Sequence, residues 1–485
     1  MADGIKNRAV KGVGWSFADN ILNQGITFLV GLVLARLLTP EEYGLIGIIT
    51  IFIAVFNSIV DSGFSNALIR KNDAKDIDFN TVFITNMALS FVLFAIMFLC
   101  APLIARFFNQ PQLIPLTKAM SSVVIINAFA IIQRTILVKK VDFKTQTKVS
   151  FIASVTSGLV GIGMALAGFG LWSLVGQQIS RQLLNSVFLW VWARWYPRLQ
   201  FSIESFKELF GFGWKLLVSG LIDTVWKEIY QVVIGKCYSA ATLGQYTRAH
   251  QFGSIFSSNL TTVVQRVSYP ILSEIQDDKI RLKNAYKKVI KVTMLITFCC
   301  MLGLAAIAKP LIVTLIGEQW LPAVPFLQII CLQMMLYPLH AINLNMLQLQ
   351  GRSDLFLKLE IIKKIISVGP LLLGIFINIY WMLFGSVVTG FIGYYLNAFY
   401  SGRILNYNIW EQVRDIIPSF IIAGIMALIV FCISLLNLPS LPLLILQISV
   451  GFGLAILLCE VLKIDAYFEV KSITLSFLKK FKHGK

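Results

Sequence analysis

Residues 78–106 have the sequence DFNTVFITNMALSFVLFAIMFLCAPLIAR, in which charged side chains occur only at the two ends. Because a helix needs about 20 apolar residues to cross a bilayer, this stretch predicts a transmembrane helix. The rest of the chain has the same character: 57% of its 485 residues are hydrophobic and 14% are charged, against roughly 25% charged in a soluble domain. The composition excludes a water-soluble globule and predicts an all-α integral membrane protein without a soluble catalytic domain.

Apolar runs bounded by charges, Pro or Gly predict about fourteen transmembrane helices in all. The net charge is +18, and most of the 42 Lys and Arg residues fall in the termini and the even-numbered connections. This distribution predicts that both termini are cytoplasmic, and no nucleic-acid partner is expected. The predicted helices cover residues 13–37, 42–69, 78–106, 113–138, 146–168, 171–195, 208–236, 241–272, 285–315, 322–349, 355–378, 380–404, 414–437 and 441–463.

An internal repeat emerges when the chain is shifted by about 200 residues. Gly14-Trp15 then falls near Gly213-Trp214, and Tyr43-Gly44 meets Leu243-Gly244. Six helices per repeat is an even number, so the two halves predict a pseudo-two-fold axis along the membrane normal. The predicted parts are an N-terminal half at 1–196, a cytoplasmic amphipathic linker at 197–208, a C-terminal half at 209–405, two added helices at 406–464 and a basic amphipathic cytoplasmic tail at 465–485.

Polar side chains recur on single faces of several predicted membrane helices. Asn20, Asn23 and Gln24 share one face of the first helix, and Lys215, Asp223, Lys227 and Tyr230 share one face of the seventh. Four helices, two from each half, carry such stripes, which favours a water-filled central cavity between the halves. Two alternatives stay open: hydrogen bonds that only join helices, and a neutral Asp223–Lys227 couple.

The charges on these faces are mostly basic, which favours an anionic ligand such as a phosphate. An arginine near a helix end can instead reach the membrane surface, and that alternative stays open for Arg134. The cysteines form no CxxC spacing, so neither a metal site nor another cofactor is expected. The substrate-binding candidates are Lys215, Lys227, Arg181, Arg248, Arg134, Asn20, Asn23, Gln24 and Tyr230, and the ion-coupling candidates, for H⁺ or Na⁺, are Asp61, Asp223 and Glu228.

Four segments resemble one known family. They are Gly168-Phe169-Gly170-Leu171-Trp172-Ser173-Leu174-Val175, Ile234-Gly235-Lys236, Leu243-Gly244-Gln245-Tyr246 and Tyr269-Pro270-Ile271-Leu272-Ser273. In order and spacing they are similar to the polysaccharide-transport flippases of the multidrug/oligosaccharidyl-lipid/polysaccharide exporter superfamily. The resemblance covers nearly the whole chain.

The resemblance implies a transporter of the bacterial inner membrane, not an enzyme. Its members move undecaprenyl-diphosphate-linked oligosaccharide from the cytoplasmic to the periplasmic leaflet, for lipopolysaccharide O-antigen or exopolysaccharide. The expected partners are the lipid-linked oligosaccharide, membrane lipids, and the polysaccharide polymerase with its chain-length machinery. The alternatives are a lipid II flippase or multidrug exporter of the same fold and, outside transport, a membrane glycosyltransferase or polymerase.

Overall fold

The computed structural model describes residues 2–61, 63–436 and 438–483, and within these ranges it contains helices and no β-strand. The all-α class is therefore confirmed. The helices are α1 (Ala2–Leu37), α2 (Pro40–Asp61), α3 (Phe64–Arg70), α4 (Asp76–Phe108), α5 (Leu113–Lys139), α6 (Phe143–Leu166), α7 (Trp172–Ala193), α8 (Ile203–Cys237), α9 (Ala240–Glu274), α10 (Lys279–Ala306), α11 (Ala308–Ile316), η1 (Glu318–Trp320), α12 (Ala323–Met334), α13 (Tyr337–Leu349), α14 (Ser353–Ile366), α15 (Val368–Phe376), α16 (Ile379–Leu405), α17 (Ile409–Ile433), η2 (Ser434–Leu436), α18 (Ser440–Val461) and α19 (Asp465–His483).

Each predicted transmembrane segment corresponds to one of these helices or to two consecutive ones. The predicted helix at 42–69, for example, is α2 followed by α3, and the one at 355–378 is α14 followed by α15. In the described part of the chain, ten helices are long and apolar enough to cross a membrane. The chain is a multi-pass membrane protein, while the number of fourteen spans and the pseudo-two-fold symmetry stay predictions.

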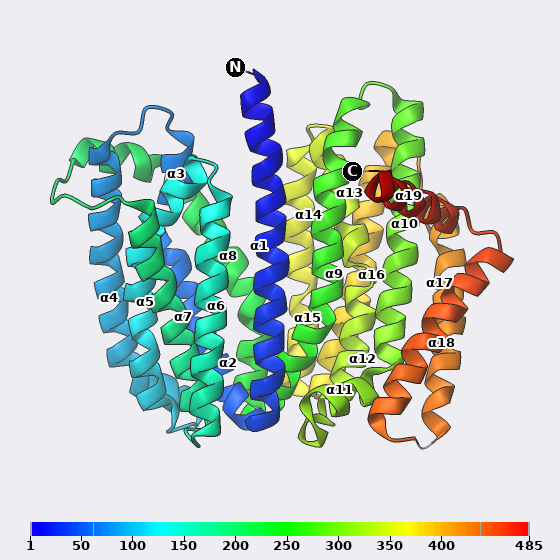
Figure 1. The fold of residues 1–485 in the computed structure, drawn as a ribbon, viewed down its shortest axis with the longest axis horizontal. Coiled ribbons are helices and arrows are strands. Elements are labelled where there is room, and N and C mark those ends of the chain that lie inside the picture. Colours follow the sequence, from blue (N-terminus) through cyan, green and yellow to red (C-terminus); the bar gives the residue numbers. More distant parts are fainter. Residues whose placement is uncertain (1, 62, 437, 484–485) are drawn as a thin grey trace. The chain divides into compact units, whose positions relative to one another are not determined.

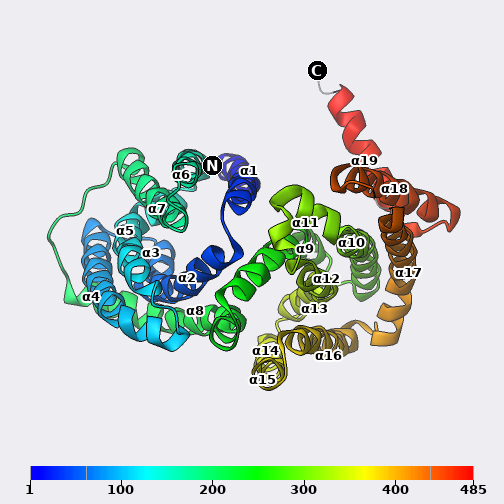
Figure 2. The same ribbon diagram turned by 90° about the horizontal axis from the view of Figure 1, so that it is seen from below.

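The first compact unit comprises residues 1–244 and contains α1 to α8 and the first turn of α9, up to Gly244. In this unit α4 packs on α5, α6 packs on both α1 and α7, and α2 lies between α5 and α8 (Figures 1 and 2). The predicted linker at 197–208 contains the first turn and a half of α8, which Ser202 caps through its side chain. The helix α8 is thus grouped with the N-terminal helices in this unit.

The second compact unit comprises residues 245–485. Its α10 packs along α17, α17 packs on α18, and α16 packs on α12, α13 and α15. Within the predicted tail, Asp465–His483 forms the amphipathic helix α19, which runs at a steep angle to α17 and α18 (Figure 1). The Lys288 ammonium of α10 lies 2.6 Å from a carboxylate oxygen of Glu469 and fixes α19 to the unit.

Ion pairs hold α17 against α10 at one end of these helices. The Glu411 carboxylate lies 3.1 Å from Lys283 Nζ and 2.5 Å from Lys287 Nζ, and Asp415 lies 3.1 Å from Lys291 Nζ. The buried Tyr407 hydroxyl donates to Asp415 at 2.8 Å. Burial, together with this carboxylate, raises the pKa of Tyr407 far above that of a free phenol, so the hydroxyl keeps its proton and the bridge persists at any physiological pH.

Two glycines let α2 cross the start of α9 at backbone contact. A Cβ atom on Gly44 would lie 1.7 Å from the carbonyl oxygen of Ala240, and one on Gly244 would lie 1.8 Å from that of Pro40. Each glycine thus packs against the first turn of the other helix. These are the two glycines that the repeat aligns, and no larger residue fits at either position without moving the backbone.

We predict that Gly44→Val destabilises the first unit, because its side chain would overlap the Ala240 carbonyl. Overpacking of this kind costs about 1–3 kcal/mol, and the midpoint of thermal unfolding in detergent should fall accordingly. The matched control is Gly163→Ala on α6, where a Cβ meets nothing within 4 Å. A Gly44→Val protein that unfolds at the same temperature as the control would contradict the close crossing.

Candidate functional site

A polar cavity of about 500 Å³ lies inside the first unit, between α2, α3, α5 and α8. Asn57 and Asp61 of α2 and Asn127 and Arg134 of α5 line it. Asn127 lies at the middle of α5 and Asn57 near the middle of the apolar span Pro40–Arg70, where an unsatisfied polar group is costly. The cavity therefore supplies several hydrogen-bonding groups at membrane depth.

The local backbone explains why these side chains meet. Asn57, Asp61 and Ser65 follow one another at a spacing of four residues, and the Ser65 hydroxyl donates to the Asp61 carboxylate. Between them, Gly63 has a φ of 70°, which a side chain would disfavour, and directs the chain from α2 into α3. A Cβ on Gly63 would also lie 2.5 Å from the Gly213 carbonyl oxygen, so α8 approaches closely enough to close the cavity.

A chain of amide hydrogen bonds joins three helices beside the cavity. Asn127 Nδ2 donates to Asn57 Oδ1 at 3.1 Å, and Gln182 Nε2 of α7 donates to Asn127 Oδ1 at 2.7 Å. Asn127 thus serves as both donor and acceptor, and an amide with both functions can also recognise hydroxyl groups of a sugar. The sequence pattern did not single out Asn127, because one asparagine in an apolar run does not form a repeating polar face.

Arg134 is the basic residue in the lining of the cavity. The partly buried guanidinium lies within electrostatic range of two carboxylates, those of Asp61 and Asp19. Asp19 Oδ1 accepts from Asn23 Nδ2 at 2.6 Å, and Asn23 Oδ1 accepts from Ser154 Oγ of α6 at 2.8 Å. Asn23 therefore joins α1 to α6, and Asp19 is a further functional candidate that the sequence analysis did not select.

Of the candidates predicted from the sequence, Asp61 and Arg134 line this cavity. Lys215, Asp223 and Lys227 are exposed along α8, and Glu228 and Tyr230 on the same helix are partly buried. The Glu228 carboxylate accepts from Gln231. Gln24 is exposed on α1, and Arg181 is partly buried on α7, next to Gln182 in the sequence. Arg248 lies in the second unit, where its guanidinium donates to Gln251 Oε1 at 2.5 Å. The Asn20 side chain is outside the described residues.

The loop that follows α3 is tied to α8 by charge. Lys71 Nζ lies 2.8 Å from Glu208 Oε2 and 3.2 Å from Asp78 Oδ1, and Ser205 Oγ donates to Asp78 at 2.6 Å. The hydrogen bond to the Glu208 carboxylate raises the pKa of Lys71 above its usual range. Because α3 and α8 both line the cavity, the Lys71–Glu208 ion pair helps to hold these two cavity walls together.

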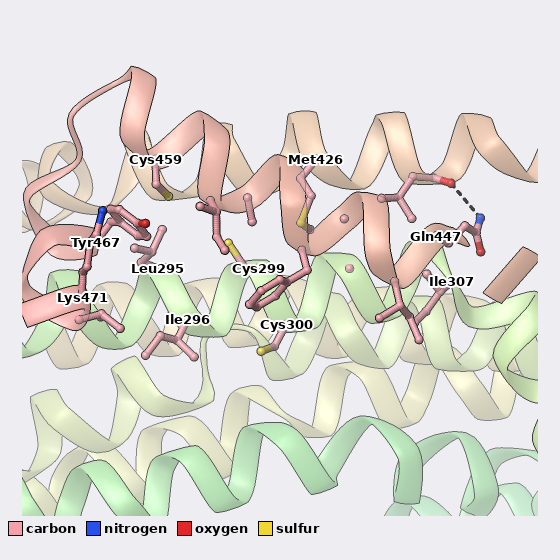
Figure 3. Close-up of a pocket in the computed structure, with 18 of the residues that line it drawn as sticks. Leu295, Ile296, Cys299, Cys300, Ile307, Met426, Gln447, Cys459, Tyr467 and Lys471 are labelled. Atoms are coloured by element: carbon pink, nitrogen blue, oxygen red, sulfur yellow. Dashed lines mark hydrogen bonds between the residues drawn. The ribbon is translucent and has the colours of Figure 1, made fainter. Parts of the chain in front are cut away.

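A second cavity, of about 570 Å³, lies in the second unit between α10, α17, α18 and α19 (Figure 3). Its lining is mostly apolar, with side chains such as Leu295, Ile307 and Met426. The amide of Gln447 at one end donates to the Val430 carbonyl oxygen at 2.8 Å. This lining offers little to a sugar hydroxyl, so the polar cavity of the first unit is the better candidate for a hydrophilic ligand.

Comparison with known proteins shows the family to which this chain belongs. The model of the family described as polysaccharide biosynthesis protein matches residues 33–325, which is more than half of the chain. The chain belongs to this family. The match includes all four walls of the polar cavity, α2, α3, α5 and α8.

Relatives within this family have names that point to envelope polysaccharides. The teichuronic acid biosynthesis protein TuaB of Bacillus subtilis (strain 168) is 27% identical over 79% of this chain and 80% of its own length. The lipopolysaccharide biosynthesis protein WzxC of Escherichia coli (strain K12) is 24% identical over 76% of each chain. The predicted membership of the polysaccharide-transport flippase family is therefore confirmed.

The fold is also similar to that of a solved structure. The lipid II flippase MurJ, in an inward closed conformation, superposes with a TM-score of 0.71 over 93% of this chain and 98% of its own, at 16% sequence identity. At this identity the similarity establishes the fold alone.

We predict that Arg134→Ala destabilises the protein, because two carboxylates near the cavity lose their common counter-charge. Arg134 is partly accessible and interacts with these carboxylates at longer range, so the free energy of unfolding should fall by about 1 kcal/mol. Adding Asp61→Asn to Arg134→Ala should restore part of the lost thermal stability, and Lys140→Ala at the exposed end of α5 serves as the control. Equal stabilities of the single and double variants would show that Asp61 and Arg134 do not interact.

Proposed function

We propose that this protein is a flippase that moves undecaprenyl-diphosphate-linked oligosaccharide from the cytoplasmic to the periplasmic leaflet of the bacterial inner membrane, for lipopolysaccharide O-antigen or exopolysaccharide. The observation that carries the proposal is the polar cavity lined by Asn57, Asp61, Asn127 and Arg134 within apolar helices. Membership of the polysaccharide biosynthesis family supports the choice of substrate.

The physical need for such a cavity follows from the cost of moving a sugar through hydrocarbon. Each hydroxyl that loses its water without replacement costs several kcal/mol, and an oligosaccharide carries many of them. The amides of Asn57 and Asn127, together with the Asp61 carboxylate, provide donors and acceptors at membrane depth. The apolar lipid chain requires no such replacement and stays in the bilayer.

The diphosphate of the carrier lipid needs cationic partners. Lys215 and Lys227 are exposed on α8, within a helix long and apolar enough to cross the membrane, and Arg181 lies on α7. We assign the diphosphate to these three residues, because ammonium and guanidinium groups bind phosphate oxygens well. Transport then proceeds by rocking of two halves about the substrate, with both termini in the cytoplasm.

The membrane potential favours this direction of transport. Moving one charge through 100 mV is worth roughly 2.3 kcal/mol, and an anion leaves a negative interior downhill. Coupling to H⁺ or Na⁺ through Asp61, Asp223 or Glu228 is compatible with the proposal but is not required by it. In the periplasm, the polysaccharide polymerase and its chain-length machinery are the partners that would take over the flipped unit.

A deletion strain tests the proposed function. Without the protein, surface polysaccharide should be lost, and the complete undecaprenyl-diphosphate oligosaccharide should accumulate on the cytoplasmic leaflet, where external glycosidases cannot reach it. Accumulation of single units exposed on the outer side would instead identify a polymerase or ligase and would exclude a flippase.

We predict that the pair Lys215→Ala and Lys227→Ala fails to complement this deletion, because the diphosphate loses two cationic contacts. Surface polysaccharide should fall by roughly tenfold or more. Lys207→Ala, near the start of the same helix, should complement fully at equal protein abundance. Wild-type polysaccharide from the double variant would refute the assignment of these lysines but not the flippase itself.

A further inference from the structure

An ion pair in the second unit lies at membrane depth and belongs to no site described above. Lys363 Nζ is 2.5 Å from Glu360 Oε1, both on α14. The segment formed by α14 and α15 runs from Ser353 to Phe376, so Lys363 lies close to its middle. On the neighbouring α16, a Cβ on Gly393 would lie 3.3 Å from Lys363 Cδ, and Gly393 is likewise near the middle of that helix.

The pair lies on a face of α14 that is turned away from lipid. Leu357, Ile361 and Ile365 are 61%, 51% and 66% exposed and follow one another at a spacing of four residues, which makes them the lipid-facing stripe of the helix. At 100° per residue, Lys363 lies almost opposite this stripe. The side chains of Lys363 and Glu360 nevertheless keep 20% and 33% of their surface accessible.

Accessible charges at this depth need water or a polar ligand, since exposure to hydrocarbon is costly. The face of α14 that carries Glu360 and Lys363 therefore faces an aqueous space. The helix also ends three residues after Lys363 and restarts as α15 at Val368, and the Ser367 hydroxyl between them donates to the Lys363 carbonyl oxygen at 2.8 Å. Interrupted helices of this kind are typical of binding sites in transporters.

A purely structural role does not explain the pair. The ion pairs between α10 and α17 join two helices, as Lys287 and Glu411 do. Glu360 and Lys363 are three residues apart on one helix, so their ion pair does not connect α14 to another helix. The neighbouring His340 of α13 lies with its Nδ1 atom 3.2 Å from Asn397 Nδ2 and so joins α13 to α16. In the described contacts, the charged partner of Lys363 is the Glu360 carboxylate.

We infer that Lys363 is an anion-binding residue of the second unit, and that Glu360 occupies it while no ligand is bound. The inference rests on the proposed function, because the ligand is an anionic group of the transported molecule. A phosphate of the lipid carrier and a carboxylate of an acidic sugar share the required chemistry, and either one replaces the Glu360 carboxylate at Lys363. Glu360 thereby neutralises the lysine in the empty site and lowers the cost of burying it.

Binding to the purified full-length protein tests this inference. The probes are undecaprenyl diphosphate without sugar, a water-soluble oligosaccharide containing a uronic acid, and undecaprenol as the uncharged control, with binding measured by native mass spectrometry. Lys363→Ala should weaken binding of one anionic probe by roughly tenfold or more. Lys363→Arg should keep binding within about threefold, and Glu360→Gln should tighten it, because the competing carboxylate is gone.

The matched control is Lys358→Ala, an exposed lysine near the start of the same helix. An effect on the diphosphate probe identifies the carrier lipid as the ligand of Lys363, and an effect on the uronic-acid probe identifies the sugar. Unchanged binding of both anionic probes by Lys363→Ala, or an equal loss with Lys358→Ala, overturns the inference. If the wild-type protein binds neither anionic probe and its deletion leaves surface polysaccharide intact, the proposed function itself fails.

Discussion

The structure depends on one constraint: inside a membrane, every polar group must find its partner within the protein or in enclosed water. Asn127 illustrates how the first unit meets it. This asparagine accepts from Gln182 and donates to Asn57, so one side chain satisfies polar groups on two other helices. Asn57 and Asn127 also line the polar cavity. The groups that hold α2, α5 and α7 together are thus also available for contact with a sugar, and stability and function use the same chemistry.

Charged residues meet this constraint in two different ways. Lys287 and Glu411 pair across α10 and α17, and Lys71 joins the loop after α3 to Glu208 of α8. Such pairs join separate elements near the helix ends. Arg134, by contrast, lies among carboxylates at a cavity, and Lys363 pairs within its own helix. In the described contacts neither of these two charges joins separate helices through an ion pair, which is why we associate them with ligand binding.

Besides hydrogen bonds and ion pairs, close backbone contacts also hold the helices in place. Gly44 and Gly244 let α2 and the first turn of α9 meet without side chains between them. Gly63 does the same where α3 passes α8 and also supplies the positive φ that ends α2 beside Asp61. The position of the Asp61 carboxylate is therefore set by a glycine that carries no chemistry of its own.

The sequence by itself determined the all-α membrane class, because apolar runs such as 78–106 can be satisfied only as helices in lipid. It also determined the ends of most helices, since charges, Pro and Gly mark where apolar periodicity stops, and it singled out Asp61 and Arg134. Periodicity did not show that the segment at 355–378 is two helices, because apolar residues continue on both sides of Ser367. Only the tertiary structure decided that Asn57, Asn127 and Gln182 form one chain of hydrogen bonds and that Asp19 shares Arg134 with Asp61. Helical phase gives the direction of a side chain on its own helix, whereas its partners depend on how separate helices pack.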